Sequence, residues 1–185
     1  RLSFDAHKLV LGGIQKHAEK LVEAKRIVII ACGTSWHAGL VAEYLLEDLC
    51  RIPVEVEYAS EFRYRNPVID KGDIIIAISQ SGETADTLAA IELAKSKGAI
   101  ILGVVNSVGS SISRLTHEGA YLHTGPEIGV ASTKAFTGQL TVLIMIALRV
   151  AMLKQTISLP TYQDLLEALH QIPNKVKRVL EKNGQ

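Results

Sequence analysis

The sequence has no surplus of charge of either sign, and its charged residues are not clustered. Its 185 residues include 20 basic and 19 acidic side chains, which leave a net charge of +1. A nucleic-acid-binding surface needs a concentration of Lys and Arg, and an anionic membrane surface attracts the same kind of patch. The balance therefore predicts neither a nucleic-acid partner nor a membrane partner.

Long hydrophobic runs are also missing. No uninterrupted apolar run approaches the roughly 20 residues that span a bilayer. The first residues lack the apolar stretch of a secretory signal. We therefore expect a cytoplasmic protein. The chain begins at Arg1 rather than at a methionine, which fits a piece of a longer protein.

Cysteine is scarce, and so are metal and nucleotide signatures. Cys32 and Cys50 stand among apolar neighbours. A disulfide between them is conceivable, but two buried free thiols are the favoured interpretation. No pair of Cys or His residues has the spacing of a zinc site, and neither GxxxxGK[ST] nor GxGxxG occurs. We predict no metal and no cofactor.

What the sequence does contain is a series of short β-branched runs, at 26–31, 54–58, 74–78, 100–105 and, more weakly, 120–123. Continuous runs of this kind are typical of strands that are buried on both faces of a parallel sheet. Amphipathic helical segments at 35–49 and 84–97 separate them, and Gly98 is the expected C-cap of the second. The alternation predicts a doubly wound α/β domain.

Helical patterns dominate the two ends of the chain. A helix is expected at 14–23 after the glycine pair at 12–13, and a long, very apolar helix at 132–154. The length of the latter suggests packing against something large, such as another subunit. We expect a break at 159–160 and a last helix at 162–181 that Pro173 kinks or splits. The predicted division is 1–24 (N-terminal extension and helix), 25–154 (core domain) and 155–185 (C-terminal helical segment).

Two hydroxyl-rich turns follow predicted strands and lead directly into helices. They comprise Cys32, Gly33, Thr34 and Ser35 in the first turn, and Ser79, Gln80, Ser81, Gly82, Glu83 and Thr84 in the second. In parallel sheets, ligands bind beyond the carboxyl ends of the strands. A helix N-terminus offers unpaired N–H groups and a partial positive charge, so an anion docks there without Lys or Arg. We infer a compact sugar phosphate, because no basic residue lies in the second turn to hold a triphosphate.

Ordinary helix capping is the competing explanation for these turns, since Ser and Thr are common N-caps that contribute about 1 kcal/mol each. Capping accounts for one hydroxyl per helix, however. It does not account for Ser79, Ser81 and Thr84 together in one turn.

A third loop, 125–134, enters the long helix and could close over the same pocket. Ser132 or Thr133 is a plausible cap of that helix. Glu127 and Lys134 are candidates for acid/base chemistry, although a solvated or salt-bridging role is favoured for both.

These three segments closely resemble the glucosamine-6-phosphate synthase family. The similar stretches are 32–35, 79–87 and 127–135, with further likeness at 59–65 and 109–112, and the likeness extends over essentially the whole chain. The resemblance implies the sugar isomerase (SIS) fold, a flavodoxin-like three-layer α/β/α arrangement around a five-stranded parallel sheet. It also implies the first of two SIS subdomains of an enzyme that makes glucosamine 6-phosphate and glutamate from fructose 6-phosphate and glutamine.

The resemblance assigns binding roles residue by residue. It implies that the phosphate is held by Ser35, Ser79, Ser81 and Thr84, with Gln80 beside them. It implies that the sugar is lined by Cys32, Gly33, Thr34, Val130 and Ser132. The family's dimers and the long apolar helix together favour a homodimer.

The chain departs from the family in extent. The family's glutaminase part and its second SIS subdomain, which supplies the acid/base groups, have no counterpart here. Cys32 therefore does not match the amide-cleaving cysteine, and we expect a fragment that binds fructose 6-phosphate or glucosamine 6-phosphate with no catalytic residue for full turnover. A non-catalytic sugar-phosphate sensor and a stand-alone isomerase that uses Glu127 are the alternatives.

Overall fold

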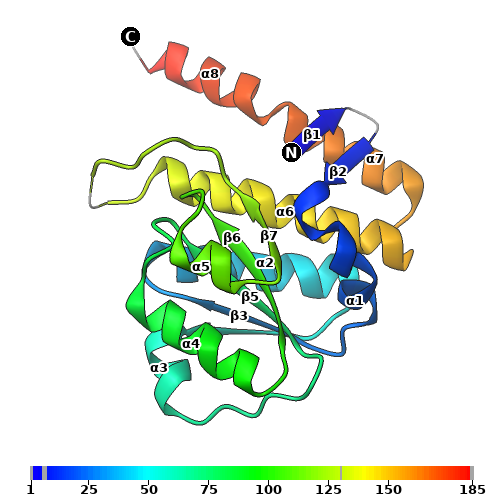
Figure 1. Cartoon of the computed structure of the whole chain (residues 1–185). Coiled ribbons are helices and arrows are strands. Elements are labelled where there is room, and N and C mark those ends of the chain that lie inside the picture. The colour runs from blue at the N-terminus through cyan, green and yellow to red at the C-terminus, as the bar shows by residue number, and fades with distance from the viewer. Residues whose placement is uncertain (1, 6–7, 130, 184–185) are drawn as a thin grey trace.

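The structure is a computed structural model that describes residues 2–5, 8–129 and 131–183. Val130, one of the predicted sugar-lining residues, lies outside the described residues. Within them, a central sheet of five parallel strands is covered by helices on both faces (Figure 1). The strands are β3 (Ile27–Ala31), β4 (Val54–Tyr58), β5 (Ile74–Ser79), β6 (Ile100–Val105) and β7 (Glu118–Tyr121). The predicted doubly wound fold is confirmed.

The strand order explains where a ligand can bind. The sheet runs β4-β3-β5-β6-β7, with every neighbouring pair parallel. The chain moves outward in one direction after β3 and in the other direction from β5 onward. The two connections that follow β3 and β5 therefore leave a crevice between them, which is where flavodoxin-like sheets bind their ligands.

Alternate side chains of each strand feed two separate cores. Ile27, Ile29 and Ala31 of β3 pack toward one face, while Val28 and Ile30 pack toward the other, and all are buried. The first face is covered by α1 (Ala18–Glu23), α2 (Thr34–Cys50) and α6 (Lys134–Lys154). The second is covered by α3 (Ala59–Tyr64), α4 (Ala85–Ser96) and α5 (Ser111–Leu115). Burial on both faces is what the continuous β-branched runs predict.

Helix α6 is the central helix of the first core. By length and composition alone its 21 residues could cross a membrane. The sequence showed no such run because Lys134, Arg149 and several polar side chains interrupt it. In the fold, α6 packs along α2, and the buried side chains on its length belong to the main hydrophobic core. Core packing therefore accounts for its apolar composition.

The N-terminal segment is more regular than its sequence suggests. It forms an antiparallel hairpin of β1 (Leu2–Asp5) and β2 (Lys8–Leu11), followed by the 3₁₀-helix η1 (Gly12–His17) and α1. The helix expected at 14–23 is thus a 3₁₀ turn that continues as a short α-helix. Leu9 and Leu11 are buried, and the Leu9 N–H donates to the Tyr162 hydroxyl at 3.2 Å. Leu9 and Tyr162 are far apart in the sequence, so a local sequence pattern could not reveal their contact.

The C-terminal segment ends in two helices, α7 (Leu159–His170) and α8 (Ile172–Lys182). The predicted split at Pro173 is confirmed, since α8 starts one residue before that proline. The long helix α6 ends before the predicted break at 159–160, but the next helix starts earlier than the predicted residue 162, because Pro160 lies in the first turn of α7, whose N-terminus Ser158 caps. Strand β7 lies two residues earlier than predicted and ends before His123, whose φ of 53° does not fit a strand.

Candidate functional site

The turns after β3 and β5 meet at the crevice in the sheet and line one cavity of about 410 Å³. The loop before α6 closes another side of it. The described lining residues are Cys32, Gly33, Thr34, Ser35, Ile78, Ser79, Gln80, Ser81, Thr84, Glu127, Gly129, Ala131 and Ser132. None of these is Lys, Arg or His, so any attraction of an anion must come from N–H groups and hydroxyls.

The turn after β5 is organised by its own hydroxyls. Ser79 is buried at the end of the strand, and its Oγ accepts the Gly82 N–H at 3.0 Å. The Ser79 and Thr84 hydroxyls lie 3.1 Å apart, and either can donate to the other. Two hydroxyls carry two hydrogens and this bond uses one, so one hydroxyl hydrogen of the pair is left to point at a ligand. Ser81 accepts the Glu83 N–H at 3.2 Å, which tightens the same turn.

The segment 110–112 packs against this turn and holds it in place. Gly82 has a φ of 70°, and its carbonyl accepts the Ile112 N–H at 2.9 Å. A Cβ at this position would lie 2.0 Å from Ser110 Oγ, so only glycine fits. The Glu83 carboxylate accepts the Ser111 N–H at 2.8 Å, and that bond lowers the pKa of Glu83. The turn is therefore held in one shape by contacts to 110–112.

The two helices that start at the crevice have open N-termini. Gly33 is the N-cap of α2 and Thr84 is the N-cap of α4, and neither makes a side-chain capping bond. The first N–H groups of both helices thus lack side-chain partners from their caps, and the helix dipole places partial positive charge there. Simple capping, the alternative explanation for the hydroxyl-rich turns, does not describe these two helices.

In the turn after β3, the buried Ser35 hydroxyl is bonded to a side chain that the sequence pattern did not identify. The Gln139 amide of α6 donates to Ser35 Oγ at 2.9 Å, and Gln139 is fully buried. Since Ser35 accepts from Gln139, its own hydrogen is available to donate elsewhere. A polar side chain within an apolar helix was the signal in the sequence that could have drawn attention to Gln139. Gly33, with a φ of 59°, sets the shape of this turn.

The loop before α6 is held by Glu127. Its carboxylate accepts bonds from the Ser132 hydroxyl, from the Thr133 N–H and hydroxyl, and from the Ala135 N–H, at 3.0–3.3 Å. Thr133 is the N-cap residue of α6, but its own side chain does not cap the helix. Lys134 is exposed and has no ion pair among the described residues. The favoured solvated or salt-bridging role therefore holds for Lys134 as a solvated side chain, whereas Glu127 has a structural role as the cap of α6.

Both cysteines are free thiols, but the favoured interpretation of two buried thiols holds only for Cys50, because Cys32 is half-buried. Cys50 is buried, and burial raises the pKa of its thiol to about 12 despite the opposing charge of Lys154. Cys32 lies at the edge of the cavity, 4.0 Å from the Thr87 hydroxyl, and no basic side chain is among the described residues that line the cavity. Nucleophilic catalysis by either thiol therefore finds no support here.

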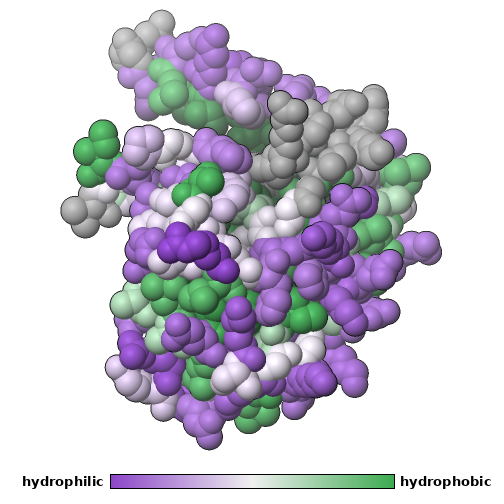
Figure 2. Space-filling view, viewed as in Figure 1, coloured by the Kyte–Doolittle hydropathy of each residue, from purple (hydrophilic) through white to green (hydrophobic). Residues whose placement is uncertain are grey.

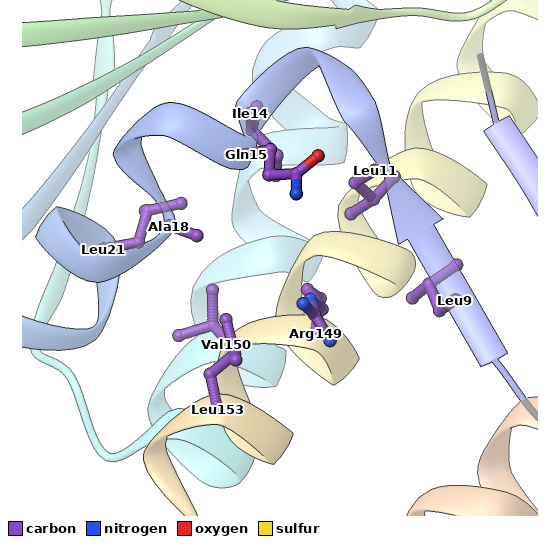
Figure 3. A pocket seen from close by; sticks show the side chains of 9 residues that line it. All are labelled: Leu9, Leu11, Ile14, Gln15, Ala18, Leu21, Arg149, Val150 and Leu153. Atoms are coloured by element: carbon purple, nitrogen blue, oxygen red, sulfur yellow. The ribbon is translucent and has the colours of Figure 1, made fainter.

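A different cavity of about 210 Å³ lies between β2, α1 and α6 (Figure 3). Its walls are mostly aliphatic, with Gln15 and Arg149 as the polar residues among those that line it. The described residues that line it do not include the clustered hydroxyls of the crevice. The crevice therefore remains the better candidate for a polar, anionic ligand.

Of the ten residues predicted to bind ligand, nine line the crevice cavity, and the tenth is Val130, outside the described residues. That these nine contact a ligand stays a prediction. Ile78, Gly129 and Ala131 line the cavity without having been predicted. They carry no polar side-chain group, so chemistry-based reasoning had no reason to select them.

Comparison with known proteins gives consistent matches. The model of the SIS domain family matches residues 20–149. The glutamine–fructose-6-phosphate aminotransferase (isomerizing) of Bacteroides thetaiotaomicron is 62% identical over 185 residues, which is 100% of this chain and 30% of that protein. A rat aminotransferase of the same name is 43% identical over 186 residues, again 100% of this chain and 27% of that protein.

Among solved structures, the C-terminal domain of glucosamine-fructose-6-phosphate aminotransferase from Francisella tularensis superposes with a TM-score of 0.86. It is 39% identical, and the match covers 90% of this chain and 47% of that one. The chain thus spans less than a third of the length of the Bacteroides and rat aminotransferases.

Proposed function

The chain belongs to the SIS domain family, and from this premise we propose that it is the phosphosugar-binding first half of the isomerase part of an isomerizing glutamine–fructose-6-phosphate aminotransferase. The observation that carries the proposal is the cavity at the crevice. There, two open helix N-termini and a cluster of hydroxyls face one space, and the described residues that line it include no basic side chain. The identity to aminotransferases along the whole chain supports the same assignment.

The chemistry of the cavity suits a sugar monophosphate. Neutral N–H and O–H donors at a helix N-terminus match phosphate oxygens and need no counter-ion. A cavity of about 410 Å³ is at the lower end of the range for small-molecule sites, about 300–1,000 Å³. The phosphate would sit at the turn 79–84 and the sugar would extend toward Cys32, Thr34 and Ser132. Fructose 6-phosphate and glucosamine 6-phosphate both have this shape.

We propose that the chain binds this ligand but does not complete the reaction. Isomerisation requires a group that takes and returns a proton near the sugar carbons. Glu127, the one carboxylate among the described residues that line the cavity, is committed to four hydrogen bonds at the start of α6. The acid/base groups would come from a second SIS subdomain of the longer protein.

The C-terminal helix α8 is a suitable contact for that second subdomain. It has no buried residue, and Ile172, Val176, Val179 and Leu180 are all exposed. Helix α8 lies away from the sheet (Figure 1), and the same end of the molecule shows hydrophobic patches among hydrophilic atoms at the top of Figure 2. We further propose that the whole enzyme is a cytoplasmic homodimer of the amino-sugar pathway.

The proposal is tested by calorimetric titration of the chain with fructose 6-phosphate, glucosamine 6-phosphate and unphosphorylated fructose. We expect the two phosphosugars to bind and fructose not to bind. Ser81→Ala should raise the Kd for fructose 6-phosphate about tenfold, because a hydrogen bond to a charged group is lost.

Ser96→Ala is the matched control, since it removes an exposed hydroxyl at the far end of α4. It should leave the Kd unchanged. Binding of fructose as tight as that of its phosphate, or equal effects of the two variants, would contradict the assignment of the turn 79–84.

A further inference from the structure

Among the described residues that line the crevice cavity, Glu127 is the only charged one. Glu127 lines the crevice cavity and also an adjoining cavity formed with Gln80, Asn106, Ser107, Val108, His123, Gly125 and Pro126. Among the described residues that line these two spaces, Glu127 is the only carboxylate, and His123 is the only basic side chain, in the adjoining cavity. A ligand in the crevice therefore meets hydroxyls and N–H groups at one end and a carboxylate at the other.

The Glu127 carboxyl group is held in its ionised form. Burial opposes ionisation, but the bonds from Ala135, Thr133 and Ser132 outweigh it, and the pKa of Glu127 lies below its ordinary value. All four of these bonds are donated to the carboxylate. Protonation of the carboxylate would remove an acceptor position that these bonds use. Glu127 therefore stays negatively charged when an anionic ligand approaches.

Three of the helices that start at this edge of the sheet, α2, α4 and α6, differ in how their N-termini are capped. The first N–H groups of α2 and α4 have no side-chain cap. At α6, the N–H groups of the N-cap residue Thr133 and of Ala135 in the first turn both donate to Glu127. The negative charge of Glu127 also offsets the positive end of the α6 dipole. An anion is thus attracted more strongly toward α2 and α4 than toward α6.

We propose that Glu127 is a specificity-determining residue that fixes the orientation of the sugar phosphate and limits it to one phosphate group. The inference rests on the proposed function, which places the phosphate at the turn 79–84. A sugar monophosphate then lies with its uncharged end toward Glu127 and Ser132. A bisphosphate would bring its second phosphate toward Glu127, and the described lining of the crevice offers no basic residue to compensate, so it is disfavoured.

The test is a comparison of fructose 6-phosphate with fructose 1,6-bisphosphate by calorimetry, using the ratio of the two Kd values. In the unmodified chain we expect the monophosphate to bind more tightly. In Glu127→Gln the ratio should shrink roughly fivefold, the size of a unit-charge repulsion across a water-filled pocket. Glu92→Gln, which removes an exposed carboxylate on α4 outside the cavity, should leave the ratio unchanged.

A second variant separates charge from loop structure. Glu127→Asp keeps the charge but shortens the side chain, so it should weaken binding of both ligands while preserving the ratio. An unchanged ratio in Glu127→Gln, or equal affinity of the unmodified chain for both ligands, would overturn the inference while the proposed function stands. If fructose 6-phosphate itself does not bind, the proposed function and the inference fail together.

Discussion

Replacing Gly82 with valine is expected to weaken phosphosugar binding at least about tenfold. The residue has a φ of 70°, and a Cβ there would lie 2.0 Å from Ser110 Oγ and 2.4 Å from Ser110 Cβ. The turn must move to relieve these contacts, and the bonds from Gly82 N to Ser79 and from Ile112 N to Gly82 move with it. Each lost hydrogen bond to a charged ligand costs about 1.5–3 kcal/mol, so the Kd should rise at least about tenfold.

The matched control is Gly72→Val, measured in the same calorimetric titration. Gly72 also has a positive φ, 93°, but a Cβ there would meet nothing within 4 Å. It precedes β5 and so lies at the opposite edge of the sheet from the crevice. Both variants carry the strain of a left-handed backbone, and only Gly82→Val should lose binding. Equal losses in the two would show that strain alone, rather than the shape of the turn, explains the effect.

The largest loss of stability is expected from Phe62→Ala. Phe62 is fully buried in α3 and belongs to the core between the sheet and α4. Truncation of a buried phenylalanine to alanine leaves a cavity and typically costs about 3–5 kcal/mol. The free energy of unfolding from a urea titration measures this directly.

Phe62→Leu is the control for that experiment. It retains most of the side-chain volume, and exchanges of this kind usually cost less than about 1.5 kcal/mol. A loss below that value for Phe62→Ala would mean that α3 is not anchored to the core in the way the structure has it.

The strands and the edge of the sheet that carries the site could be predicted because the information is local. The run 26–31 is β-branched almost throughout, which identifies a strand buried on both faces, and the hydroxyl-rich turns follow such strands directly. Since parallel strands end at the same edge, the residues 32–35 and 79–84 could be expected to meet. They do meet, around one cavity.

The remaining features depend on contacts between distant segments. The bond from Gln139 to Ser35 joins residues 104 positions apart, and no local pattern pairs them. Helix α3 is only six residues long, and it is stabilised by burying Phe62 rather than by helix propensity. The role of Glu127 was ambiguous because its hydrogen-bond partners depend on how the loop before α6 folds. A carboxylate eight residues before Ala135 looks like a catalytic candidate until its four bonds to the start of α6 are seen.

The central claim is that a sugar phosphate docks at the open N-termini of α2 and α4. The most direct measurement is the change in backbone amide NMR shifts of the chain on titration with fructose 6-phosphate. The account predicts that the largest changes fall on residues 33–36 and 80–86, with saturation at a single Kd. Largest changes at the cavity between β2, α1 and α6 (Figure 3), or no saturable change in the turn 79–84, would contradict it.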